Sequence, residues 1–301
     1  MKKLLSIIIP HYNDLEGLLN CLESIGHLSD SYFEDFEVIV CDNNSPHFKL
    51  DTTPFKFDIK IVKETERGAG PARNKGVSIA IGKYLAFTDC DCWLDKNFVS
   101  IGLEFIKRLG DTAVVLGEVI IDARNNNSPS SIEAFEQIFL MDQEKCARNG
   151  DGATGNLWTS RSLFETIGPF RSGIAEDTDW CKRALSHGAS FHFNAYCIVH
   201  HPARTTLQEL KEKWGRQTAM NYNQVRTKQY FYFKWTILTI ATAASGFLHI
   251  PKALLSNRIP KKINRLKAIP TLVWCRFYRA KLMLKFLISG KTFINPIEYW
   301  K

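Results

Sequence analysis

Two aspartates and two cysteines alternate directly after an apolar run, in the segment "YLAFTDCDCWLD". The carboxylates of Asp89 and Asp91, two residues apart on an extended segment, point the same way. Their charges repel unless a cation lies between them. Mg²⁺ or Mn²⁺ suits such oxygen ligands and usually shares its other positions with phosphates and water. The pair therefore predicts a metal ion that also coordinates a phosphate-bearing ligand. The same spacing also occurs in ordinary solvated turns.

The two thiols of this segment, Cys90 and Cys92, match no standard spacing of a structural zinc site. We therefore do not expect zinc from this pair, and we expect Cys90 to pack in the core. None of the eight cysteines forms a C-x-x-C pair, and the opening "MKKLLSIIIP" reads as a buried strand rather than a secretory signal. These features favour a reducing, cytoplasmic setting.

Strand-like and helix-like stretches alternate in the first half of the chain. The expected strands cover 4–10, 36–42, 57–63, 83–89 and 112–121, and the helices 14–25, 71–81 and 95–109. This alternation predicts an α/β fold with a doubly wound, mainly parallel sheet. Ligands of such sheets bind at the carboxyl ends of the strands. Three of these ends carry polar residues, in "PHYND", "CDNNS" and "DCD", so we expect a site at that edge.

The rest of the chain is more mixed, and its charge is uneven. We expect a helix over 131–147, glycine turns around a short helix over 151–170, a helix over 176–188, a strand over 190–204 and an amphipathic helix over 207–225. From Lys228 onward there are 14 Lys and Arg against one acid, Glu298, so this tail carries +13 and residues 1–227 carry −5. Such asymmetry predicts an anionic surface as a partner.

The basic tail is also rich in aromatic and apolar residues, a composition typical of segments at a membrane interface. Attachment to an anionic membrane surface is our first interpretation. The alternatives are a single spanning segment over 235–251 and helices that pack on the catalytic body or on a partner. We do not expect a nucleic-acid partner, because the tail has no recognisable binding fold and its apolar residues outnumber its cations.

Five segments in order resemble the motifs of one family: "SIIIPHYND", "VIVCDNNS", "ERGAGPARNKGVSIAIGKYLAFTDCD", "TGNLWTSRSLFETIGPF" and "IAEDTDWCKRALSHG". They resemble the inverting family 2 glycosyltransferases, which have the GT-A nucleotide-sugar fold. The resemblance covers about 4–205. It implies a GT-A catalytic domain over 1–227 and leaves 228–301 as a basic, aromatic, helical, membrane-associating extension.

The resemblance implies transfer of a single sugar from a nucleotide-diphosphate-sugar, with a UDP-sugar as the expected donor, to an acceptor hydroxyl. The Q-x-x-R-W signature of processive polymerases is absent. The implied acceptor is a lipid-linked or cell-envelope glycan, and the implied location is peripheral, on the inner face of the cell membrane. The alternative is a catalytically silent, glycosyltransferase-like scaffold on the membrane.

The resemblance also implies roles for single residues. Asp42 would hold the nucleotide base in a pocket that is lined by Pro10, Tyr12 and Asn13. Arg73 would lie near the diphosphate, and Asp89 would contact the ribose or a metal-bound water. Asn43 departs from the family pattern, in which a second Asp is frequent, and leaves Asp42 alone for base recognition.

The remaining implied roles concern the cation and the proton. Asp91 would ligate Mn²⁺ or Mg²⁺ directly, with Asp89 and His201 nearby, and at most one of His200 and His201 would serve because neighbours on a strand face opposite sides. Asp177 would be the general base for a direct displacement, with the adjacent Glu176 as its rival. Cys92 stands where relatives often have a further acid.

Overall fold

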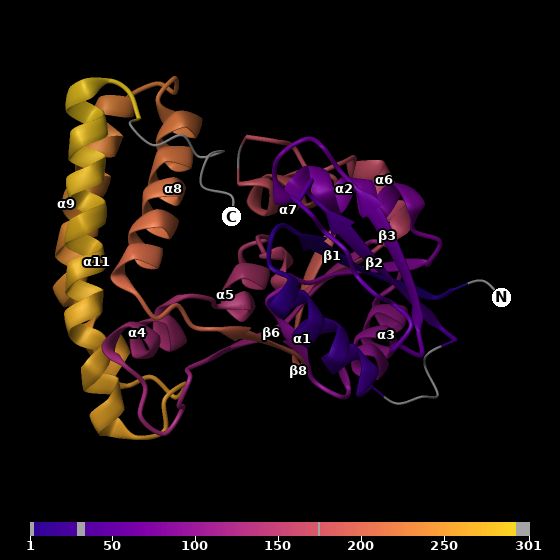
Figure 1. Ribbon diagram of the computed structural model, residues 1–301. Helices are drawn as coiled ribbons and strands as arrows, with labels where there is room; N and C mark the ends of the chain where they lie inside the picture. Colours follow the sequence, from indigo (N-terminus) through magenta and orange to yellow (C-terminus); the bar gives the residue numbers. More distant parts are fainter. Residues whose placement is uncertain (1–2, 29–33, 174, 293–301) are drawn as a thin grey trace.

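The computed structural model describes residues 3–28, 34–173 and 175–292 (Figure 1). Its centre is an eight-stranded mixed sheet with the order β3-β2-β1-β4-β7-β6-β8-β5. The strands are β1 (Leu5–His11), β2 (Phe36–Asp42), β3 (Asp58–Lys63), β4 (Tyr84–Phe87), β5 (Trp93–Leu94), β6 (Ala113–Asp122), β7 (Leu157–Ser160) and β8 (Ser190–Pro202). The first four strands pair in parallel, and β7 runs antiparallel between β4 and β6.

Helices cover both faces of the sheet, as a doubly wound fold requires. They are α1 (Leu15–Gly26), α2 (Ala69–Ile79), α3 (Phe98–Leu109), α5 (Gln143–Arg148), α6 (Arg161–Ile167) and α7 (Glu176–Ser186). Ile7 and Ile9 of β1 share a buried cluster with α1 and α3, whereas Ile8 shares another with α2, α6 and α7. Because alternate side chains of a strand face opposite sides, a continuous apolar run is what such a strand needs.

A second group of helices lies beside this sheet body (Figure 1). We call it the helical unit. It contains α4 (Ser131–Phe139), α8 (Leu207–Val225), α9 (Phe231–Leu248), α10 (Ile250–Leu254) and α11 (Lys262–Ser289). Two apolar clusters hold these helices together, one around Trp214 and Leu272 and one around Tyr222 and Trp235.

An ionic cluster joins the helical unit to the end of β8. The carboxylate of Glu136 in α4 is fully buried, and it pairs with Arg204 at 3.1 Å and with Lys213 of α8 at 3.3 Å. The backbone N–H of Arg204 donates to the same carboxylate at 3.0 Å. Burial lowers the pKa of Lys213 to about 8, although Glu136 opposes that shift. A buried carboxylate needs such partners, so this cluster fixes how the two parts of the molecule meet.

Most expected elements are present with small shifts at their ends. The segment 131–147 is two helices rather than one, because the side chain of Asp142 accepts from the backbone N–H of Lys145 and caps a new helix. The short strand β7 lies inside the segment that we expected to be glycine turns and a helix. Its four buried residues are too few to show a strand period.

The tail forms helices that pack on α4 and α8, which belong to residues 1–227, so the packing alternative describes its observed contacts. The domain division at residue 227 stays a prediction. No helix in the described part of the chain is both long enough and apolar enough to cross a membrane.

Candidate active site

The carboxyl ends of β1 and β2 bring His11 beside Asp42. Asp42 is buried, and its carboxylate accepts from Nδ1 of His11 at 3.0 Å and from the backbone N–H of Ser45 at 3.1 Å. Nε2 of His11 accepts from the backbone N–H of Asp14 at 3.2 Å, so the ring carries its proton on Nδ1. Asp42 therefore organises the strand ends. Its contact with a nucleotide base stays a prediction.

The other predicted donor-binding residues surround this pair. Pro10 is buried in β1, Tyr12 is half-buried, and Asn13 is exposed. Asn13 has a left-handed backbone with φ of 52°, and its N–H donates to the Ser45 hydroxyl at 2.8 Å. His11 was not among our predicted site residues, although it stands in the same "PHYND" segment.

Asn43 holds the loop that leads into α2. Its side-chain amide nitrogen donates to the carbonyls of Glu64 and Glu66 at 3.3 and 2.6 Å, and its oxygen accepts from the N–H of Gly68 at 2.8 Å. A carboxylate cannot donate, so an Asp at this position would lose two of the three bonds. The departure from the family pattern thus has a structural reason.

Arg73 of α2 links the end of β4 to the start of α7. Its buried guanidinium donates to Asp89 at 2.6 Å and to Glu176 at 2.9 Å. Burial alone would lower the pKa of Arg73, but the charges of Asp89 and Glu176 outweigh burial and raise it. Both terminal nitrogens contact protein carboxylates, so the predicted contact of Arg73 with a diphosphate stays a prediction.

Two neighbours of Arg73 allow this link. The Asn74 side chain donates to the carbonyl of Phe170 at 2.8 Å and accepts from its N–H at 2.9 Å, which holds the segment before α7 against α2. At Gly70, an added Cβ would lie 3.3 Å from the side chain of Glu176. A larger residue at position 70 would therefore press on Glu176.

At the start of α7, Glu176 and Asp179 pair with arginines, whereas Asp177 has no ion-pair partner among the described residues. Its carboxylate accepts from the N–H of Thr178 at 2.7 Å. Burial and the charge of Glu176 raise its pKa to about 7. A carboxyl with this pKa can accept a proton near neutral pH. The carboxylate of Glu176 already accepts from Arg73, which makes it less available for the same task.

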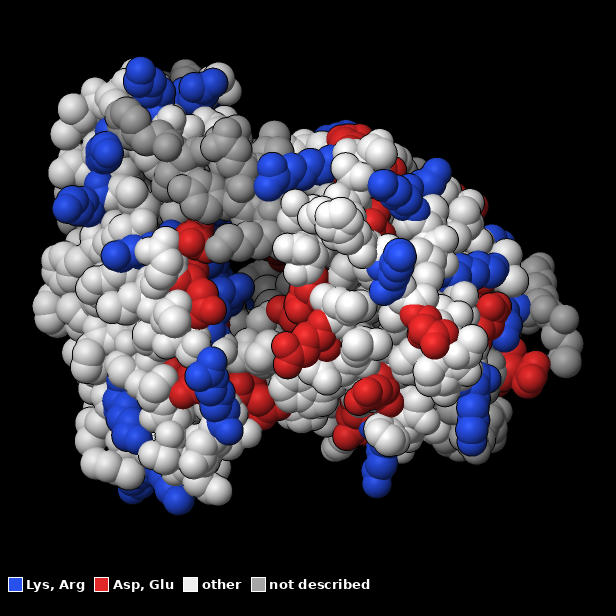
Figure 2. All heavy atoms as spheres, viewed as in Figure 1, with Lys and Arg blue, Asp and Glu red and all other residues white. Residues whose placement is uncertain are grey.

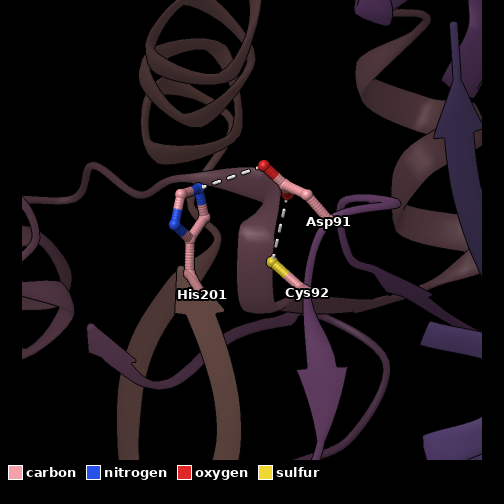
Figure 3. Close-up of side chains that lie close together, drawn as sticks. All are labelled: Asp91, Cys92 and His201. Carbon is pink, nitrogen blue, oxygen red and sulfur yellow. Dashed lines mark hydrogen bonds and ion pairs between the residues drawn. The ribbon is translucent and has the colours of Figure 1, made fainter. Parts of the chain in front are cut away.

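Asp91 and His201 face each other at the end of β8 (Figure 3). Nε2 of His201 lies 3.7 Å from Oδ2 of Asp91, and Nδ1 donates to the carbonyl of Pro202 at 2.7 Å. The lone pair of Nε2 is therefore free to bind a cation. Cys92 lies beside them, with Sγ 3.7 Å from Oδ1 of Asp91. Asp89 is not part of this cluster; its carboxylate contacts Arg73.

His200 points away from this cluster, as the alternation along a strand predicts. Its Nδ1 lies 2.6 Å from the carboxylate of Asp122, and its ring stacks on Trp93. Beside Asp91 and His201 lies a cavity of about 760 Å³, which Trp93, Arg124 and Arg204 also line. Figure 2 shows acidic side chains around the hollow between the sheet body and the helical unit.

Comparison with known proteins identifies the family of this chain. A model of glycosyl transferase family 2 matches residues 6–168. The chain belongs to this family. The match includes the ends of β1, β2 and β4 and all of α2, whereas Asp177 and His201 lie beyond it.

Two relatives illustrate the range of this glycosyltransferase family. Glycosyltransferase AglE of Haloferax volcanii is 26% identical over 289 residues, which cover 90% of this chain and 91% of AglE. A PGL/p-HBAD biosynthesis glycosyltransferase of Mycobacterium bovis is 29% identical over 192 residues, which cover 61% of this chain and 70% of that protein.

Solved glycosyltransferase structures share the fold. The mannosyltransferase PcManGT from Pyrobaculum calidifontis, in complex with GDP-Man and Mn²⁺, aligns with a TM-score of 0.59 and 17% identity over 94% of this chain and 88% of its own. TarS 1-349 of S. aureus, in complex with UDP-GlcNAc, aligns with a TM-score of 0.52 and 17% identity over 97% of this chain and 93% of its own. At this identity the likeness supports the GT-A-like fold alone.

Proposed function

We propose that this glycosyltransferase transfers a single sugar from a nucleotide-diphosphate-sugar to an acceptor hydroxyl, with inversion at the anomeric carbon. One observation carries the proposal. Arg73 joins Asp89, at the end of β4, to Glu176, and Asp177 follows directly with a pKa near 7. A poised base thus lies at the strand edge where ligands of such sheets bind.

Asp177 is the residue that we assign as general base. It would take the proton from the acceptor hydroxyl while the oxygen attacks the anomeric carbon. Glu176 accepts from Arg73 at 2.9 Å, and the charge of Glu176, after burial, raises the pKa of Asp177. A single displacement needs no covalent intermediate, which is why one base suffices.

Asp91 and His201 would hold a divalent cation, Mn²⁺ or Mg²⁺. The arrangement fits such an ion, because a carboxylate oxygen and an unprotonated ring nitrogen face each other at 3.7 Å. When bound, the cation would stabilise the charge on the departing diphosphate. Asp89 would contact the ribose rather than the cation, since Arg73 fixes its carboxylate elsewhere.

We expect UDP as the donor nucleotide, with GDP as the alternative. Asp42 and its neighbours would form the pocket for the nucleotide base, which we expect to be the uracil of UDP. The neighbours in complex with UDP-GlcNAc and with GDP-Man show that this fold accommodates both nucleotides.

We also propose that the helical unit contacts an anionic membrane surface. The supporting observation is the exposed apolar face of α9, which includes Phe233, Ile240, Phe247 and Leu248, each more than half exposed. Basic residues such as Lys252 and Lys262 are exposed nearby in the chain, in α10 and α11. Rings and aliphatic chains with flanking cations suit a headgroup region. This contact would bring a lipid-linked acceptor to the site from the cytoplasmic side.

A donor screen tests the enzymatic proposal against the scaffold alternative. Sugar release from UDP- and GDP-sugars is measured with Mn²⁺ for the native chain and for Asp177→Asn. We expect slow release from one donor class by the native chain and a large loss in the variant. Silence of the native chain with every donor would favour a scaffold.

A further inference from the structure

Cys92 lies in the cluster that would hold the cation, although the sequence spacing of its thiol gave no reason to expect it there. In the described part of the chain, Asp91, Cys92 and His201 form a group whose ligand atoms all lie within 4.8 Å of one another. In Figure 3, one oxygen of the Asp91 carboxylate faces the imidazole and the other faces the thiol. The structure thus adds a soft ligand to a carboxylate and an imidazole.

The separations are close to those of a four-coordinate metal. Bonds of about 2.0–2.3 Å to nitrogen, oxygen and sulfur place tetrahedral ligands about 3.3–3.8 Å apart. Sγ of Cys92 lies 3.7 Å from Oδ1 of Asp91, Nε2 of His201 lies 3.7 Å from the other oxygen, Oδ2, and one ligand atom from each residue lies within 4.8 Å of the other two. Small side-chain rotations would bring all three atoms onto one ion. Three protein ligands leave one position open, as in catalytic zinc sites.

The access to this cluster is also suitable. The Cys92 side chain is buried, the His201 side chain is largely buried, and the Asp91 side chain is 40% exposed. Asp91 and His201 line the cavity of about 760 Å³, so an ion can enter from that side.

We propose that Cys92 is a third protein ligand at this site and makes it prefer thiophilic cations such as Zn²⁺ and Co²⁺ over Mg²⁺. Soft thiolate ligands select such metals, whereas Mg²⁺ prefers oxygen ligands alone. A metal that binds the sulfur displaces the thiol proton, which leaves to solvent. The inference rests on the proposed function, because it assumes that Asp91 and His201 hold the cation.

Cobalt titration of the full chain tests this inference, because Co²⁺ substitutes for zinc and reports on sulfur ligation. We expect the native chain to develop a sulfur-to-cobalt charge-transfer band in the near ultraviolet with one equivalent of Co²⁺. Zn²⁺ should displace the Co²⁺ and remove the band, and excess Mg²⁺ should not. Absence of the band from cobalt-loaded native chain would overturn the proposal without any variant.

Matched variants locate the sulfur. Cys92→Ser and Cys92→Ala should lose the band and bind Zn²⁺ on the order of tenfold more weakly or worse, while Cys90→Ser should keep both properties. A melting curve for each variant shows that it is folded. A band that survives both Cys92 changes would overturn the inference.

The two levels of failure are distinguishable. Cobalt that binds without a sulfur band, and whose affinity depends on Asp91 and His201, would refute the role of Cys92 and leave the cation site intact. If calorimetry detects no divalent cation bound to the native chain with or without UDP, the cation of the proposed function fails as well.

Discussion

The sheet body and the helical unit differ in where their charged and apolar side chains lie. The sheet body gathers buried acids at one edge and pairs them with His11, Arg73 and backbone N–H groups. The helical unit buries one ionic cluster around Glu136 and leaves large apolar side chains on its surface. The contrast accords with our two proposals, an active site in the sheet body and a membrane-contacting surface on the helical unit.

The comparison depends most on Asp177, a buried acid of the sheet body with no ion-pair partner among the described residues. Asp177→Asn should lower the transfer rate by about 10²–10⁴-fold, because a general base contributes that much. Donor binding, measured as a thermal shift, should stay unchanged. Glu176→Gln is the control for the rival assignment. A variant Asp177→Asn that transfers sugar at the native rate would contradict our choice of base.

The assignment of Asp177 as the base also predicts in which direction the transfer rate changes with pH. The pKa of Asp177 is raised to about 7, so the carboxyl is protonated below that pH and cannot accept a proton. Transfer should therefore fall about tenfold per pH unit below about pH 7 and level off above it. A rate that stays level down to pH 5 would argue against a base with a raised pKa.

Replacing Arg73 tests whether its ion pairs with Asp89 and Glu176 stabilise the sheet body. Arg73→Ala removes the cation between Asp89 and Glu176, and it should lower the free energy of unfolding by about 3 kcal/mol. Arg171→Ala breaks an exposed pair with Asp179 and should cost less than about 1 kcal/mol. Urea titrations of both variants measure the difference, and equal losses would refute the structural role of Arg73.

Asn43 tests the link between the strand edge and α2. Asn43→Asp loses two donated bonds and sets a carboxylate against two carbonyls, so unfolding should become easier by about 2 kcal/mol. The exposed Asn20 provides a control, Asn20→Asp, with little expected change. An Asn43→Asp variant as stable as the native chain would show that the loop does not need this amide.

The apolar surface of the helical unit supplies the smallest expected effect. Phe247→Ser combined with Leu248→Ser should weaken sedimentation with anionic phospholipid vesicles by about tenfold. Leu15→Ser combined with Leu19→Ser removes exposed leucines from the sheet body and should leave vesicle binding unchanged. Equal binding by both double variants and the native chain would end the proposed contrast.

The same two regions differ in how far sequence predicted them. In the sheet body, apolar runs and strand-end motifs placed β2 at 36–42 and brought Asp42, Asp89 and Asp91 to one edge, and the GT-A-like fold is confirmed. Periodicity carries such information because it reports which face is buried. It does not report long-range hydrogen bonds, so the pairing of His11 with Asp42 and the role of Asn43 were not predicted.

Other differences have the same origin. Arg73 bridges Asp89 and Glu176. Arg73 and Glu176 are 103 positions apart in the sequence, and no local pattern specifies their pairing. The spacing of Cys90 and Cys92 in sequence carries no information on the position of Cys92 beside Asp91 and His201 in space. In the tail, composition indicated a surface but not the packing of α11 on α4 and α8.

Nucleoside diphosphate binding is the most direct test of the claim that the acids at this edge hold a cation and, through it, a diphosphate. Calorimetry with UDP and GDP is performed with and without Mn²⁺ on the native chain, on Asp91→Ala and on the exposed control Asp51→Ala. We predict that one nucleotide binds the native chain and the control only with Mn²⁺, and that Asp91→Ala abolishes this binding. Binding by Asp91→Ala with native affinity, or no binding of either nucleotide to the native chain, would contradict the account.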